Sequence, residues 1–494
     1  MFSKNKLFIF TSFILLIPTI WNLWNRNCDY FTDYLFCSSN PSDFIKYLNF
    51  FFLFFIFLGL SFLYYKIISS RHSSESGNLV WKNVLLIVFI FFLISPFGTT
   101  DIFYYRGVAQ GEIEKQINPY FGGFSKDLEF LNLKFDNLSP VMYPPLFLQI
   151  NKAIYSFSPT NEILSVYLYK FFSLIVFLFC VYLIKRYFDT QTAILFALNP
   201  LLLFEFVTNA HLDIYMILFF VLSIVFLKKQ KIVFSVYFVF VATLIKFNAI
   251  LVLPFYALYF LSISENFKNL LVNCLKISIG AISGLLTIVI FYIPYWKGFE
   301  TLQGISKQAD WSFNTLYERL VFTSLNPFLY LFEGKYNYSS FRDIWLILVF
   351  IGFTILALHI VINLPFRNLV SSVFTCLRRQ GFQLSADSLY FYSGFLLLLF
   401  PTLMMRSFLP WYLSWATIFF IFSHFKYKKV VLFLLSLILA IYYPTVYLIG
   451  HFNYFQGQVI YYNSLIIVEW LLFSLITYLL FRSKIKCLKT PLSN

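Results

Sequence analysis

Long runs of apolar residues, separated by short polar segments, constrain this chain more than any other feature. A helix needs about 20 mostly apolar residues to cross the hydrocarbon core of a bilayer. Runs that meet or approach this length fall at 7–24, 44–68, 82–97, 163–184, 190–207, 212–228, 232–246, 249–262, 270–293, 343–364, 388–405, 410–425, 429–449 and 463–482. With 60% hydrophobic and 12% charged residues, the chain has too little polar surface for a water-soluble globule. We therefore predict an all-α fold, a polytopic transmembrane helix bundle of about 14 spans that forms one domain over 1–494.

The basic residues indicate how these spans are oriented. Lys and Arg gather in short segments that fall on one side of the predicted membrane, at 4–6, 66–82, 185–186, 228–231, 367–379, 426–429 and 482–489. Positively charged loops stay in the cytoplasm, so we expect both termini inside and the loops 98–142, 297–342 and 450–462 outside. The net charge of +15 then reflects orientation and contact with membrane lipids, and it does not indicate nucleic acid as a partner.

The first apolar run and the cysteines fit this topology. Residues 1–24 contain no small-residue cleavage site, so they predict a retained first helix. Cys28 and Cys37 share an outward loop, where they form either a disulfide or two free thiols. The sequence contains no Cys or His cluster with metal-ligand spacing, and it predicts neither a metal ion nor a cofactor.

The outward loop 98–142 holds the densest group of acids, tyrosines, glycines and prolines in the chain. Thr99, Thr100 or Asp101 is suited to cap a helix, and at a helix N-terminus the carboxylate of Asp101 would stay ionised. The amphipathic residues 102–105 predict that this helix lies at the membrane surface. Asp101 is therefore a candidate base at the boundary of lipid and water. The alternative is a plain helix cap with no chemistry.

Two proline-containing turns stiffen the same region. Residues before proline are pushed out of the helical conformation, so 118–120 and 143–146 are expected to fix extended backbone. The segment 146–157 is too short to span a membrane, and we expect it to dip into the bilayer or lie flat. Glu112 and Glu114 predict a solvated helix face more than a catalytic role.

Short motifs in a fixed order carry a resemblance to a known family. They are Asp101, Tyr104-Tyr105, Gly111, Asn118-Pro119-Tyr120, Tyr143-Pro144-Pro145-Leu146, Asn209-Ala-His211-Leu-Asp213, Ala242-Thr-Leu-Ile-Lys246 and Pro410-Trp411-Tyr412-Leu-Ser-Trp415. Together they resemble GT-C-fold integral membrane glycosyltransferases, especially bacterial polyprenol-phosphate-mannose-dependent mannosyltransferases. The resemblance implies inverting transfer of a hexose, expected to be mannose, from a polyprenyl-phosphate-linked sugar donor to a hydroxyl of a glycan or glycolipid acceptor. It places the reaction on the periplasmic face of a bacterial inner membrane.

Such a transfer needs a base for the acceptor hydroxyl and a cation for the leaving phosphate. Asp101 is the expected general base. Many enzymes of this class place the acid directly after the first helix, so Asp29 and Asp33 are alternatives to an acid that follows the third span. Lys246 and Arg406 are the expected cations, because a charge in an apolar helix is costly unless it faces a cavity or a partner. The alternative for both is snorkelling to the lipid headgroups.

Other residues complete the predicted site. His211 and Asp213 either contact the donor or form a satisfied interfacial pair. Glu205 and Lys170 are expected to pair with each other. Further substrate contacts are predicted for polar and aromatic side chains of the motifs: Tyr104, Tyr105, Asn118, Tyr120, Tyr143, Trp411 and Tyr412. The aromatic side chains of residues 411–415 are equally typical of an interfacial belt. The loop 297–342 is the expected acceptor or lid region.

A transporter or flippase for a lipid-linked saccharide is the alternative function. Transport favours charges near the bilayer midplane and two related halves with interrupted helices. The candidate charges lie instead at the outer ends of the predicted spans, and no repeat is visible in the sequence. The pattern therefore favours the glycosyltransferase.

Overall fold

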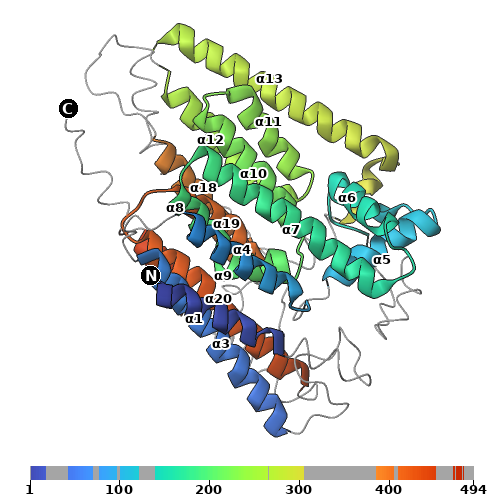
Figure 1. The fold of residues 1–494 in the computed structure, drawn as a ribbon. Helices are drawn as coiled ribbons and strands as arrows, with labels where there is room; N and C mark the ends of the chain where they lie inside the picture. The colour runs from blue at the N-terminus through green and yellow to red at the C-terminus, as the bar shows by residue number, and fades with distance from the viewer. Residues whose placement is uncertain are drawn as a thin grey trace, which may run out of the picture.

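Helices form every regular element in the described part of the computed structural model (Figure 1). The structure describes residues 2–17, 43–69, 77–96, 101–121, 140–264, 266–304, 385–404, 410–451, 471–472, 474–480 and 482. The prediction of an all-α fold is confirmed. The predicted span 343–364 lies outside the described residues, as does much of 463–482.

The predicted spans 44–68, 163–184 and 212–228 agree with helices of the structure to within three residues at each end. In the first half of the chain the described elements are α1 (Phe2–Ile14), α3 (Asp43–Ser69), α4 (Gly77–Leu93), α5 (Asp101–Glu114), η1 (Pro119–Phe121), α6 (Pro145–Ser156), α7 (Glu162–Tyr187), α8 (Thr190–Ala197), α9 (Pro200–Leu202), η3 (Leu203–Thr208) and α10 (Asp213–Lys228). The later ones are α11 (Ile232–Thr243), η4 (Phe247–Val252), α12 (Leu253–Ser262), α13 (Phe267–Tyr292), η5 (Ile293–Tyr295), η6 (Phe299–Leu302), α18 (Ala386–Met404), α19 (Pro410–Phe422) and α20 (Lys428–His451).

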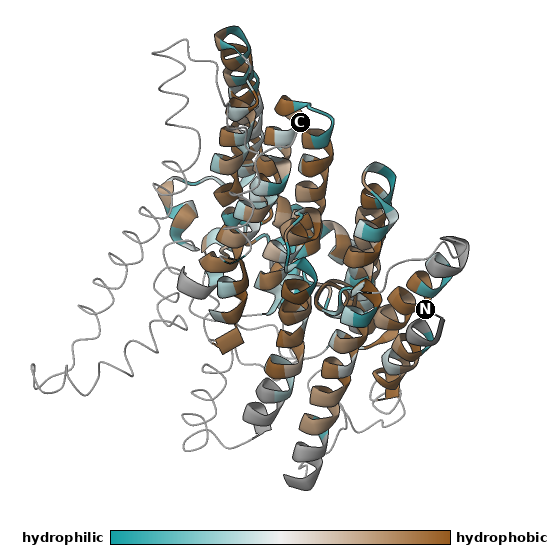
Figure 2. Cartoon of the chain, turned by 90° about the vertical axis from the view of Figure 1, so that its left-hand side faces the viewer, coloured by the Kyte–Doolittle hydropathy of each residue, from teal (hydrophilic) through white to brown (hydrophobic). Residues whose placement is uncertain are grey.

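Apolar surfaces on the outer helices fit a membrane protein. Large apolar side chains stay exposed along α13, including Leu275, Leu286 and Ile290, and such a surface in water would favour aggregation. Figure 2 shows hydrophobic residues along most of the length of the helices. Among the described residues, three helices are long and apolar enough to cross a membrane, or four if the bent pair 190–197 and 200–208 counts as one span. The predicted number of about 14 spans is thus not confirmed.

Helix α19 lies at the centre of the bundle. Each of its residues, from Pro410 to Phe422, is buried. It packs against α8, α9, α10, α18 and α20, while α3 packs along α20 and α13 packs along α11 (Figure 1). A wholly apolar helix is stable only inside a bundle or in lipid, so the sequence of α19 suits this position.

The predicted span 190–207 is broken. Helix α8 and the pair α9–η3 meet at a bend of 53°. Asn199 lies at the break, where its Oδ1 accepts from the backbone N–H of Leu202 at 3.2 Å and its Nδ2 donates to the hydroxyl of Tyr64 at 3.3 Å. Pro200 follows as the first residue of α9. A capping asparagine before a proline starts a new helix, which explains the bend.

Helix α5 is buried within the protein over most of its surface. Its buried residues are distributed around the whole helix: Ile102, Phe103, Tyr105, Arg106, Gly107, Val108, Ala109 and Gly111. The short helix α6 packs over it, and α7 contacts it as well. Residues 102–109 are mostly apolar or small on every face, which suits this packing, and the position of α5 at the membrane surface stays a prediction.

Close packing of α13 on α11 depends on two glycines. A Cβ on Gly284 would lie 2.4 Å from Cβ of Phe240, and a Cβ on Gly280 would lie 2.7 Å from the carbonyl oxygen of Val233. Glycines four residues apart let membrane helices approach closely, so α13 is held to the bundle through this stripe.

We expect Gly284→Ala to lower the free energy of unfolding by about 1–3 kcal/mol, because the added methyl group forces Phe240 and the two helices apart. The midpoint of thermal unfolding in detergent measures the effect. Ser283→Ala, one residue earlier on α13, is the matched control and should leave the midpoint close to that of the wild type. Equal midpoints for the two variants would contradict the close-packing argument.

Candidate active site

Charged side chains from several segments meet at one end of the bundle. Asp101 begins α5, Glu205 lies in η3, His211 and Asp213 lie where η3 passes into α10, and Lys246 lies between α11 and η4. The first turn of α19 brings aromatic side chains to the same place. The sequence motifs that predicted a site are thus brought together in the fold.

The backbone before His211 has an unusual conformation. Element η3 is a π-helical turn, which is rare and often found at functional sites. Ala210 follows in the left-handed region with φ 52°, a conformation that costs a non-glycine residue about 1–3 kcal/mol. The backbone N–H of His211 donates to the carbonyl of Glu205 at 2.9 Å, and this bond closes the turn. The turn directs the imidazole between two acids.

A chain of polar contacts runs through this imidazole. His211 Nδ1 lies 3.3 Å from Asp101 Oδ2, and His211 Nε2 lies 3.3 Å from Glu205 Oε2. The hydroxyl of Tyr443, in α20, donates to Glu205 and accepts from the Asn209 amide at 3.1 Å. The indole of Trp411 stacks on the imidazole with ring centroids 4.1 Å apart, so the ring of His211 is fixed on both edges and on one face.

The charges of Asp101 and His211 stabilise each other. Burial alone would raise the pKa of Asp101, but the contact with His211, the charge of Lys246 and the hydroxyl of Tyr105 together hold the pKa of this carboxyl below its ordinary value. Burial alone would lower the pKa of His211, yet Asp101 and the other nearby acids raise it above its ordinary value. The arrangement therefore favours an Asp101 carboxylate beside a protonated His211.

Lys246 forms the second charged pair of the site. Its Nζ lies 2.7 Å from Asp213 Oδ1, which also accepts from Trp415 Nε1 at 2.6 Å. Around the ammonium lie the rings of Tyr143, Tyr412 and Trp415, with Nζ 5.6, 5.0 and 4.8 Å from their centroids. Lys246 therefore faces a carboxylate and an aromatic wall rather than snorkelling to the headgroups.

Side-chain exposure separates the residues that a substrate can reach from those behind them. The Asp101 side chain is 25% exposed and that of Lys246 is 13% exposed. The values for His211 and Glu205 are 0%, and for Asp213 2%. One carboxylate and one ammonium are thus accessible, while the remaining charged residues of the cluster support them from the protein interior.

The predicted aromatic residues divide in the same way. Tyr104 and Tyr143 are half-buried and flank Asp101, with ring centroids 6.3 Å apart. Tyr105 is buried, and its hydroxyl donates to Asp101 Oδ2 at 3.2 Å. Trp411 and Tyr412 are also buried. The half-buried tyrosines alone of this set offer a ring edge or face to a ligand.

Asn118 and Tyr120 belong to a neighbouring cluster that fixes the loop. Asn118 donates to the carbonyl of Tyr295 at 2.9 Å, and the hydroxyl of Tyr120 donates to the carbonyl of Tyr143 at 2.9 Å. Glu112 contributes as well, since its carboxylate lies 2.6 Å from Lys152 Nζ. The prediction of a solvated face is wrong for Glu112, because α6 packs over α5.

The predicted pair of Glu205 and Lys170 is not formed. The Lys170 ammonium donates to the carbonyls of Ile94 and Thr208 at 2.5 and 2.8 Å, while Glu205 contacts His211 and Tyr443. No sequence motif pointed to Tyr443, which follows Glu205 by 238 positions.

The described residues do not include Arg406, Asp29 or Asp33, which the sequence also predicted. Within the described ranges, no group of three or more His, Cys, Asp or Glu side chains is arranged to hold a metal ion.

The pKa shifts predict how stability depends on pH. The pKa of His211 is higher in the folded protein than in the unfolded chain. The contribution of His211 to the free energy of unfolding is therefore full below the unfolded pKa of about 6.5, and it is lost as the pH rises through the folded pKa. A lowered pKa for Asp101 keeps its own contribution intact above about pH 4. We therefore expect the unfolding midpoint of the wild type to fall as the pH rises above about 6.5, and we expect His211→Gln to reduce this fall.

The midpoint of thermal unfolding across this pH range is the measurement. Ser283→Ala, which changes no titratable group, is the control and should keep the wild-type profile. Parallel profiles for the wild type and His211→Gln would contradict the assigned ion pair.

Comparisons with known proteins extend the geometric argument. Residues 39–262 match the family model described as "Alpha-(1->6)-mannopyranosyltransferase, N-terminal domain". The match covers slightly less than half of the chain and includes Asp101, Glu205, His211, Asp213 and Lys246. No curated protein and no solved structure matches the chain. The family match supports a glycosyltransferase that transfers mannose, and it confirms the resemblance to membrane mannosyltransferases that the sequence motifs predict.

Proposed function

We propose that the protein transfers mannose from a polyprenyl-phosphate-linked donor to a hydroxyl of a glycan or glycolipid acceptor, in a single inverting displacement. The observation that carries this proposal is that two accessible charges of opposite sign, the Asp101 carboxylate and the Lys246 ammonium, lie at the same end of an apolar helix bundle. The family match supports mannose as the sugar.

Asp101 acts in this proposal as the general base. Its lowered pKa keeps it ionised at neutral pH, and its exposed oxygens can accept the proton of a hydroxyl that attacks the anomeric carbon. His211 and Glu205 are positioning residues, because both are buried and act through the Asp101 side chain. The protonated imidazole and the hydroxyl of Tyr105 fix Oδ2 of the Asp101 carboxylate.

Lys246 meets the phosphate that leaves. As the sugar–phosphate bond breaks, negative charge develops on the phosphate oxygen, and a fixed cation stabilises that charge. Asp213 holds the ammonium at one N–H, so the remaining donors stay directed toward the accessible side. Tyr104 and Tyr143 flank this space and offer surfaces on which a sugar ring can pack.

The location of the site suits a lipid-linked donor on the non-cytoplasmic face, in the periplasm of a bacterial inner membrane. A polyprenyl tail must stay in hydrocarbon while its phosphate reaches the boundary with water, which requires a site at the end of the helices. The lysines at the opposite ends of α7, α10 and α20 are typical of a cytoplasmic side.

Asp101→Asn tests the base. We expect transfer from a synthetic short-chain polyprenyl-phosphate-mannose to a panel of mannosides and membrane glycolipids to fall by about 10²–10⁴-fold while donor binding persists. Glu114→Gln, at the other end of α5, is the matched control and should keep wild-type transfer. Unchanged transfer by Asp101→Asn would exclude Asp101 as the base. Donor movement across a vesicle bilayer without transfer would favour the flippase.

Lys246→Gln tests the cation. Removing the charge that stabilises the leaving phosphate should lower kcat by about 10²-fold or more, with a smaller rise of KM for the donor. Lys115→Gln removes an exposed cation just beyond α5 and should change neither parameter. A variant that raises KM for the donor and keeps kcat would instead make Lys246 a ground-state binding residue.

A further inference from the structure

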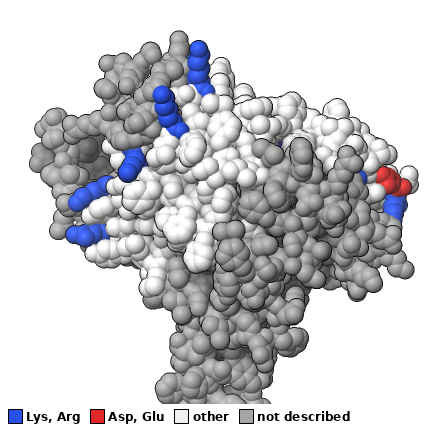
Figure 3. Space-filling model, turned by 60° about the horizontal axis from the view of Figure 1, so that its bottom comes forward, with Lys and Arg blue, Asp and Glu red and all other residues white. Residues whose placement is uncertain are grey.

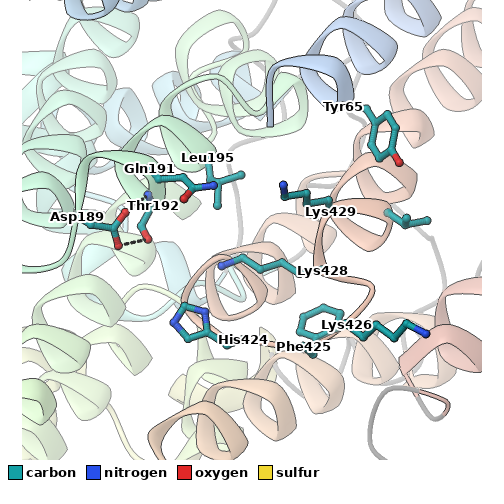
Figure 4. A pocket seen from close by; sticks show the side chains of 11 residues that line it. Tyr65, Asp189, Gln191, Thr192, Leu195, His424, Phe425, Lys426, Lys428 and Lys429 are labelled. Atoms are coloured by element: carbon teal, nitrogen blue, oxygen red, sulfur yellow. Dashed lines mark hydrogen bonds between the residues drawn. The ribbon is translucent and has the colours of Figure 1, made fainter. Parts of the chain in front are cut away.

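A cavity of about 670 Å³ lies between the beginning of α8 and the beginning of α20. Figure 4 shows the side chains that line it, and they come from α3, α8, α20 and the segment that joins α19 to α20. Neither the proposed sugar transfer nor the family match assigns a role to this place.

The cavity lies far from Asp101. Helix α19 begins beside His211, on which Trp411 stacks, and it ends at Phe422, whose ring lies 4.6 Å from that of Phe188 next to the cavity. A helix of this length spans about 20 Å. The cavity is therefore at the opposite end of the bundle, on the side that the basic segments mark as cytoplasmic.

The lining carries an excess of positive charge. Lys426, Lys428 and Lys429 contribute ammonium groups, whereas Asp189 is the acidic residue of the lining. The two oxygens of Asp189 accept from the backbone N–H and the hydroxyl of Thr192, each at 2.7 Å, so this carboxylate caps α8. Asp387 in α18 also acts on the charge of Lys428 from outside the lining, so three lysines are opposed by two carboxylates.

Lys428 is held in position, whereas Lys426 is exposed. Lys428 is half-buried, and its Nζ donates to the carbonyl of Ile421 at the end of α19 at 2.5 Å. In Figure 4, Lys428 and Lys429 extend toward α8, where Gln191 lies, and Lys426 points away from it. Two ammonium groups and an amide therefore border the same hollow.

The rest of the lining is apolar. Leu195, Phe425 and Val430 contribute hydrocarbon surface, and Tyr65 contributes a ring. Lysines also gather elsewhere along this side of the molecule, as the blue side chains at the left of Figure 3 show. This hollow differs from the open surface because it combines two directed ammonium groups with apolar walls.

We propose that the cavity binds a phosphate group. Basic pockets between membrane helices on the cytoplasmic side are suited to anionic headgroups. The phosphate is carried either by an anionic phospholipid of the adjacent leaflet or by a soluble phosphate ester, and the apolar lining favours the phospholipid. The site is independent of sugar transfer at Asp101.

Native mass spectrometry of the purified full chain in mild detergent tests the proposal. The probes are phosphatidylglycerol, phosphatidylcholine with the same acyl chains, and glycerol 1-phosphate as the soluble competitor. We expect tighter binding of phosphatidylglycerol than of phosphatidylcholine. Lys429→Gln should weaken phosphatidylglycerol binding about fivefold, and the double change with Lys428→Gln should weaken it about 25-fold.

Lys231→Gln is the matched control, because it removes an exposed charge on the same side of the molecule but outside the cavity. It should leave binding unchanged. Equal binding of the two lipids, or equal effects of Lys231→Gln and Lys429→Gln, would overturn the proposal. Displacement of the lipid by glycerol 1-phosphate would identify a soluble ester as a ligand of the same site. The unfolding midpoint shows whether a variant that loses binding is still folded. If the double variant does not fold, the comparison of Lys429→Gln with the wild type decides the outcome.

Discussion

The ion pair between Asp101 and His211 is the contact on which the rest of this end of the molecule depends. It joins α5 to the turn before α10, and His211 in turn contacts Glu205 in η3 and Trp411 in α19. Through Glu205 the contacts reach α20. An isolated buried carboxylate would be neutral, and an isolated buried imidazole would lose its proton. Each keeps its charge because the other is present, which lets an apolar bundle contain a charged site.

Much of the fold and part of the site could be predicted from the sequence. Hydropathy located the helices because membrane helices must satisfy their backbone internally over long apolar runs. The motifs around His211, Lys246 and Trp411 were found because polar residues are rare at the ends of such runs. The contact of Glu205 with Tyr443 was not predicted, since it joins residues far apart in the chain through packing alone. The same reason explains the buried position of α5.

The two ends of the bundle differ in how far their charged side chains are balanced by opposite charges. Near Asp101, each of the two accessible charges has an oppositely charged neighbour, and the acids Glu205 and Asp213 are buried. At the other end, lysines outnumber the carboxylates around the cavity at α8 and α20. Helix α19 runs between the two ends and is buried throughout. The end at Asp101 thus suits chemistry, and the other suits attraction of anions.

The candidate site is assembled from distant parts of the chain, and this has a consequence for its synthesis. The charged residues lie within 39–262, but Trp411, Trp415 and Tyr443, which fix them, arise in helices made much later during translation. A nascent chain that ends before α19 therefore contains Asp213 with Lys246 and Glu205 with His211, but it lacks Trp415 and Tyr443, whose hydrogen bonds hold the two carboxylates. The charged groups of the candidate site are thus made early in synthesis, and the side chains that fix them are added later.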